Sequence, residues 1–87
     1  MKVAYLTANT TKKQLYVVAT ANVASTLSEQ QLRRAYLALR EKMKTPDPDN
    51  PNLWIVIIDG REIWGILDEG AGPDGEDLFT ILFPEDY

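Results

Sequence analysis

Few residues in this chain could do chemistry, because its 87 residues include neither histidine nor cysteine. Those two types supply the commonest general base and the commonest transition-metal ligands, so acid–base catalysis and a transition-metal centre are disfavoured. The two serines are Ser25 and Ser28, and Ser28 is better explained as a helix cap than as a nucleophile. We therefore expect no catalytic activity and no cofactor.

Two acidic stretches offer the oxygen ligands that calcium and magnesium prefer. Residues 45–52 read T-P-D-P-D-N-P-N, and residues 68–77 read D-E-G-A-G-P-D-G-E-D. Neither follows the spacing of a calcium-binding loop, and prolines interrupt the first. Both stretches are interpreted as solvated turns, and no metal is expected in either.

Charge is unevenly distributed along the chain. Residues 1–44 carry eight Lys and Arg against two Glu, a net charge of +6, whereas residues 45–87 carry one Arg against eleven acids, a net charge of −10. The basic half could form a surface with Tyr5, Tyr16 and Tyr36, but no RNA-binding motif accompanies it and the whole chain is acidic. Nucleic acid is therefore not expected as a partner, whereas the acidic half could meet a basic protein.

One helix is specified by several signals at once. Ser28-Glu29-Gln30-Gln31 matches a capping box, and Pro46 disfavours helix at the residue before it. Apolar residues recur at helical spacing in Leu32, Ala35, Tyr36, Leu39 and Met43. The pattern predicts a helix over about residues 29–44 that lies on a sheet.

Strands are expected on both sides of this helix. Residues 2–8 and 14–21 are rich in Val, Tyr, Leu and Thr and flank a polar stretch, which predicts a β-hairpin. Asp59-Gly60 is a two-residue signal for a type I′ turn and joins residues 53–58 to 61–67 in a second hairpin. An apolar run over residues 78–83 predicts a last strand.

The turn at Asp59-Gly60 fixes the register of the second hairpin, in which Trp54 lies opposite Gly65 and its indole is expected to cover the bare backbone there. One face then carries Leu53, Ile55, Ile57, Trp64 and Ile66, and we expect it to pack on the helix. The other face carries the candidate partner-contact residues Trp54, Val56, Ile58 and Ile63. Sheet curvature, the 68–77 loop or a second copy in a homodimer would cover that face.

These elements predict a single α+β domain over residues 1–87, with one helix packed on a four- to five-stranded sheet in the order β-β-α-β-β-β. In element order alone the arrangement resembles a β-grasp fold, such as ubiquitin or the immunoglobulin-binding domain of protein G; the alternative is a β-meander with one helix across it. The chain ends Pro84-Glu85-Asp86-Tyr87 rather than Gly-Gly, so conjugation of the ubiquitin type is not expected.

Neither a signal peptide nor a membrane-spanning run is recognised, so we expect a soluble cytoplasmic protein. The capping box, the helix end and the hairpin turn all follow the local rules of folding, and natural proteins usually break such rules at functional sites. The leading hypothesis is therefore a designed or sequence-optimised protein without native function. The alternative is a natural non-enzymatic protein-binding module, ubiquitin-like or of the phage-inhibitor type, which acts through a sheet face or its acidic half.

Overall fold

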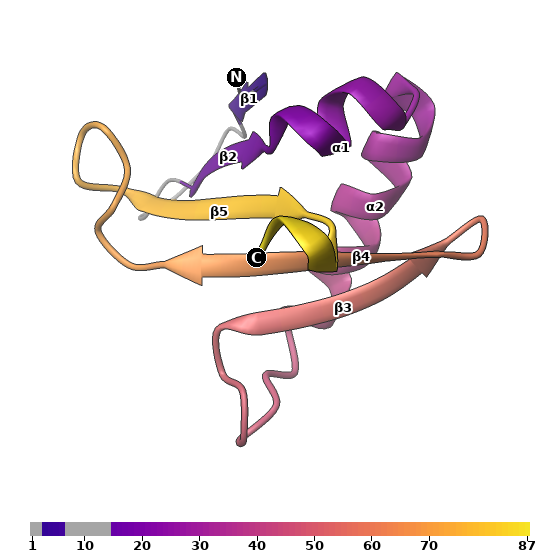
Figure 1. Cartoon of the computed structure of the whole chain (residues 1–87). Coiled ribbons are helices and arrows are strands. Elements are labelled where there is room, and N and C mark those ends of the chain that lie inside the picture. The colour runs from indigo at the N-terminus through magenta and orange to yellow at the C-terminus, as the bar shows by residue number, and fades with distance from the viewer. Residues whose placement is uncertain (1–2, 7–14) are drawn as a thin grey trace.

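In the computed structural model, which describes residues 3–6 and 15–87, five strands form one sheet and two α-helices pack on one side of it (Figure 1). The elements are β1 (Val3–Leu6), β2 (Leu15–Ala19), α1 (Ala21–Thr26), α2 (Glu29–Lys42), β3 (Leu53–Ile58), β4 (Arg61–Asp68), β5 (Asp77–Leu82) and the 3-10 helix η1 (Pro84–Asp86). The α+β class, with a helix packed on a sheet, is confirmed.

The sheet is mixed and has the strand order β1-β2-β5-β4-β3. β2 and β5 pair in parallel, with Val17 opposite Phe79, and the other three neighbouring pairs are antiparallel. A meander would pair each strand with the next one in the chain, so the parallel pair excludes that arrangement. The sheet therefore has β1 and β3 as its edges.

The first hairpin has the expected strands, with Val3 opposite Ala19; the residues that connect them lie outside the described ones. Helix α1, which follows it, was not predicted, because six residues are too few for an apolar repeat to show. Its start is nevertheless capped, since Thr20 Oγ1 accepts a hydrogen bond of 3.2 Å from the Val23 N–H. Val23 is fully buried and fixes α1 to the core.

Helix α2 begins as predicted and ends two residues early. Its capping box is formed in both directions: Ser28 Oγ accepts from the Gln31 N–H at 3.1 Å, and the Ser28 N–H donates to Gln31 Oε1 at 2.9 Å. The apolar stripe faces the sheet, with Leu32, Ala35 and Leu39 buried and Tyr36 and Met43 partly buried. The turns beyond Lys42 are tighter, because residues 44 and 45 bond three residues back, ahead of Pro46.

The second hairpin has the register predicted from its turn, with Ile58 opposite Arg61 and Trp54 opposite Gly65. Asp59 and Gly60 have φ angles of 51° and 81°, the left-handed values that a type I′ turn requires at both central positions. Two residues thus set six cross-strand pairs.

The predicted face assignment of this hairpin is wrong. The four candidate partner-contact residues lie in the core on the helix side, at 6% exposure for Trp54, 7% for Val56 and Ile58, and 0% for Ile63. They are therefore not available for contact with a partner, and the other set faces away from the helices.

Gly65 explains which face the helix covers. A Cβ at this glycine would collide with the Phe79 ring and come within 3.1 Å of Leu39 on α2. The absent side chain thus makes room for Phe79 and α2, and Phe79 rather than Trp54 covers the glycine. The Trp54 ring packs beside Phe79 instead, with 6.1 Å between the ring centroids.

Candidate interaction site

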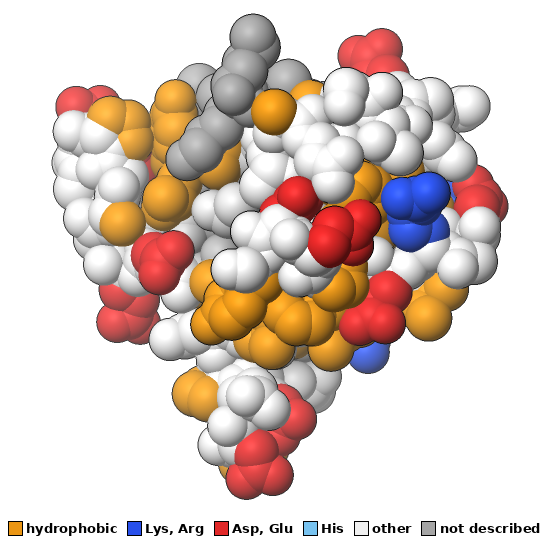
Figure 2. Space-filling view, viewed as in Figure 1, with side chains coloured by type: hydrophobic (Ala, Val, Ile, Leu, Met, Phe, Trp, Pro, Cys, Tyr) orange, Lys and Arg blue, Asp and Glu red, His pale blue; other side chains and the backbone are white. Residues whose placement is uncertain are grey.

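An apolar patch lies on the β3–β4 part of the sheet, on the side that faces away from the helices, and is seen in orange near the centre of Figure 2. Its members on β3 and β4 are Leu53, Ile55, Ile57, Trp64 and Ile66. Ile57 is 65% exposed and Ile55 is 39% exposed. Apolar side chains gathered in this way on a surface are typical of an interaction site.

The Trp64 side chain in this patch is fixed by two contacts. Its Nε1–H donates to Glu62 Oε2 at 2.7 Å, and its ring lies 5.6 Å from the ring of Tyr87. The polar atom of the indole is therefore satisfied while its ring contributes to the apolar patch.

The C-terminal segment reaches the patch because Asp86 anchors it (Figure 1). The Asp86 carboxylate accepts hydrogen bonds from Thr20 Oγ1 at 2.8 Å, Asn22 Nδ2 at 3.1 Å and the Phe83 N–H at 3.1 Å. Burial raises the pKa of Asp86, but these three hydrogen bonds outweigh it and hold the pKa below its usual value. An ionised Asp86 thus joins η1 to α1 and places Tyr87 beside Trp64.

β3 is an edge strand whose outer side is unpaired within residues 3–6 and 15–87. The Leu67 N–H donates to the Asn52 carbonyl at 3.0 Å, so the even-numbered residues of β3 direct their backbone groups toward β4. The N–H and C=O groups of Ile55 and Ile57 therefore point away from the sheet. The same two residues carry the exposed side chains of the patch.

The tip of the hairpin is fastened to α2 through Asp59. Its carboxylate accepts from Gln31 Nε2 at 3.0 Å and forms an ion pair with Arg34 at 3.2 Å. The hydrogen bond from Gln31, followed by the hydrogen bond and charge of Arg34, lowers the pKa of Asp59. These contacts hold the far end of β3 in place.

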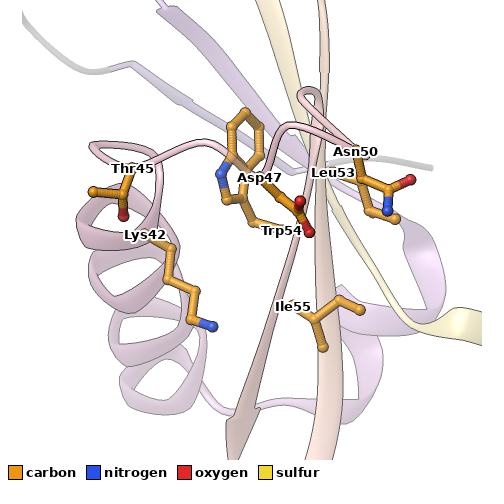
Figure 3. A pocket seen from close by; sticks show the side chains of 7 residues that line it. All are labelled: Lys42, Thr45, Asp47, Asn50, Leu53, Trp54 and Ile55. Atoms are coloured by element: carbon orange, nitrogen blue, oxygen red, sulfur yellow. The ribbon is translucent and has the colours of Figure 1, made fainter.

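A hollow of about 310 Å³ opens at the start of β3, beneath the end of α2 (Figure 3). It is lined by Lys42, Thr45, Asp47, Asn50, Leu53, Trp54 and Ile55. Trp54 Nε1 is buried and has no hydrogen-bond partner in the described part of the chain. Trp54 thus lines this hollow, while its Nε1 is shielded from solvent and its hydrogen-bonding capacity is unused within the described residues.

The other chemically reactive side chains serve local structure. Ser25 Oγ donates to the Asn22 carbonyl at 3.2 Å, and Ser28 caps α2. In the acidic loop, Asp77 accepts from the Gly70 N–H at 3.0 Å and Glu76 accepts from the Asp74 N–H at 2.7 Å. Among the described residues no group of three or more acidic side chains is placed to hold a metal ion.

Three basic residues in α2 and in the turn after it have partners within the protein. Arg34 binds Asp59, Arg40 Nη1 donates to Tyr36 Oη at 2.7 Å, and Lys44 lies 3.4 Å from Glu41. Lys2, Lys12 and Lys13, which also belong to the basic half of the sequence, lie outside the described residues.

A scan against protein-family models, a search of curated proteins and a search of solved structures each found no match to this chain. No helix in the described ranges is both long and apolar enough to cross a membrane. The function has to be argued from the surface itself.

Sequence analysis assigned Ile55 and Ile57 to the helix side, whereas both are exposed on an edge strand. The run from Leu53 to Ile58 contains no charge and no proline, which is unusual for an edge strand. That signal becomes informative only once β3 is known to lie at an edge.

Proposed function

We propose that this protein is a non-catalytic binding module that pairs an extended segment of another protein with the free edge of β3. The observation that carries the proposal is that Ile55 and Ile57 expose apolar side chains and also carry the unpaired backbone groups of an edge strand. A peptide strand that adds to a sheet uses both features, since its backbone pairs with the edge and its side chains pack on the face.

The regularity of β3 supports this proposal. Natural proteins usually protect an exposed edge with lysine, proline or a β-bulge. β3 contains neither a charge nor a proline, and its six pairs with β4 run without a bulge. The edge is thus left suitable for pairing.

The edge is also held in place before a partner arrives. Asp59 is bound by Gln31 and Arg34 at the end of β3, and prolines at positions 46, 48 and 51 restrict the connector at its start. A preformed edge saves the entropy that ordering it on binding would cost.

A designed protein without native function is the second proposal. The capping box of α2 and the type I′ turn at Asp59-Gly60 favour it, since both follow design rules. The open apolar edge disfavours it, because design rules also require edges to be charged or covered. We therefore place the binding module first.

The test compares two lysine substitutions on the folded domain. Peptides are selected from a random library displayed on phage, then titrated against the wild type, Ile57→Lys and Leu37→Lys. Leu37 is the matched control, because it lies on α2 with a comparable exposure of 58%. A lysine at the edge should weaken binding about tenfold or more, and the control should bind as the wild type does.

Three outcomes would contradict the proposal. No peptide binds more tightly than about 100 µM, Ile57→Lys binds the peptides as tightly as Leu37→Lys does, or the amide signals that shift on peptide binding in NMR spectra belong to residues outside β3. Sedimentation of the chain alone tests whether a second copy of this chain, rather than another protein, binds the edge. Self-association that Ile57→Lys abolishes would assign the edge to a second copy of this chain, which is the homodimer considered from the sequence.

A further inference from the structure

The two tryptophans differ in how their N–H groups are satisfied. The Trp64 Nε1–H donates to Glu62 at 2.7 Å. Trp54 is only 6% exposed, and its Nε1–H has no partner in the described ranges. Nearly all buried donors in native proteins are satisfied by protein, water or ligand, because leaving one unpaired is costly. The Trp54 N–H is therefore a free donor for a water molecule or for an acceptor group of a ligand.

The hollow at the start of β3 is where such an acceptor would enter. Figure 3 shows the Trp54 nitrogen on the side of the ring that is turned toward Thr45 and α2. Ile55 lines the same hollow and also carries the free backbone groups of the edge. A peptide paired with β3 would therefore run past the hollow and could place one side chain in it.

The lining of the hollow selects the type of that side chain. Trp54 and Lys42 offer donors, and Asp47 offers a carboxylate whose Oδ1 accepts from the Asp49 N–H at 2.9 Å. An entering carboxylate would meet Asp47 and the partly negative end of α2, while an entering lysine would meet Lys42. A carboxamide is neutral and brings an acceptor oxygen together with a donor NH2 group.

We propose that the hollow binds the carboxamide of an Asn or Gln in the paired segment, with its oxygen accepting from Trp54 Nε1–H; this inference rests on the proposed function. Nε1 is shielded from solvent in the free protein, so the proposal requires exposed side chains that line the hollow, such as Lys42 and Thr45, to change rotamer on binding. Successive side chains of a strand alternate between faces. The residues on either side of the carboxamide therefore lie on the apolar patch and are aliphatic.

The test uses four capped peptides of the form acetyl-Thr-Val-Gln-Val-Thr-amide, in which the central Gln is kept or replaced by Glu, Lys or Ala. We expect the Gln peptide to bind about tenfold more tightly than the Ala peptide and to shift the Trp54 indole N–H signal in NMR spectra. The Glu and Lys peptides should bind no better than the Ala peptide. In Trp54→Phe, which keeps an aromatic ring but lacks the N–H, the advantage of Gln should disappear.

The outcomes separate this inference from the proposed function. If the amides of Ile55 and Ile57 shift with every peptide but the four affinities are equal, only the carboxamide inference is overturned. If those amides shift with none of the peptides at millimolar concentration, both proposals fail. The indole signal is read on the wild type, so an unmoved Trp54 N–H in the presence of bound Gln peptide contradicts the inference even if Trp54→Phe does not fold.

Discussion

The two faces of the β3–β4 hairpin have similar compositions and opposite environments. Each carries a tryptophan and several aliphatic residues, yet one face is buried beneath α2 and the other is the outer patch. Hydrophobicity therefore did not decide which face was covered. Gly65 did so, because the space above it admits Phe79 and Leu39. In this strand pair, which is apolar on both sides, the glycine marks the packed face, whereas the two tryptophans do not distinguish the faces.

The largest expected effect on stability separates two isoleucines on opposite faces of the hairpin. Ile63→Ala should lower the free energy of unfolding by about 3 kcal/mol, because Ile63 is 0% exposed and its loss leaves a cavity in the core. Ile57→Ala on the outer patch should change it by no more than about 0.5 kcal/mol. Urea denaturation measures both, and equal losses would contradict the observed assignment of the faces.

Filling the space above Gly65 should have the next largest effect. Gly65→Ala places a Cβ against Phe79 and Leu39, and such overpacking costs about 2 kcal/mol. Phe79→Leu places a smaller side chain at that point. The double variant should therefore lose less free energy of unfolding than the sum of the two single losses. Strictly additive losses would show that Phe79 does not fill this space.

Removing the cap of α2, the helix that covers the inner face, should lower the free energy of unfolding by less than the two changes above. Ser28→Ala removes the acceptor of the Gln31 N–H and should cost about 1 kcal/mol in thermal or chemical denaturation. Ser25→Ala is the control, since Ser25 Oγ only donates to the Asn22 carbonyl at the surface. A loss within experimental error at position 28 would mean that the helix does not depend on its cap.

The smallest effect concerns the segment beside the outer patch. The pKa of Asp86 is lowered in the folded protein, so this group stabilises the fold at neutral pH and the stabilisation is lost as the pH falls through the lowered pKa. In Asn22→Ala one of its donors is missing, and the pKa should rise toward its usual value. Carbon-13 NMR titration of the Asp86 carboxyl group measures its pKa in the wild type and in Asn22→Ala. A wild-type pKa at or above the usual value would contradict the proposed anchoring.

Elements with local signals could be predicted from the sequence. The two residues Asp59 and Gly60 set every pair of the second hairpin, and Ser28 with Gln31 set the start of α2. Each signal acts over a few residues, so neighbours in the chain suffice to reveal it. This is also why the end of α2 was predicted less well than its start, since the tightened turns beyond Lys42 have no comparable signature.

The features that depend on distant residues could not be predicted. The helix side of the hairpin depends on how Phe79 and Leu39 meet Gly65, and these three residues belong to different elements. The free edge at Ile55 and Ile57 depends on the position of β5 between β2 and β4. The candidate partner-contact residues named from the sequence were therefore placed on the side of the hairpin that is buried.

The central position of β5 has a consequence for the order of folding. This strand pairs with β2 in parallel and with β4 in the antiparallel sense, so it joins two hairpins that otherwise share no strand contact in the sheet order. Each hairpin can close early from local contacts, whereas the parallel pair links residues about sixty positions apart and forms slowly. Until β5 is in place the sheet is in two halves, and β2 and β4 each have an unpaired edge at which another chain can add.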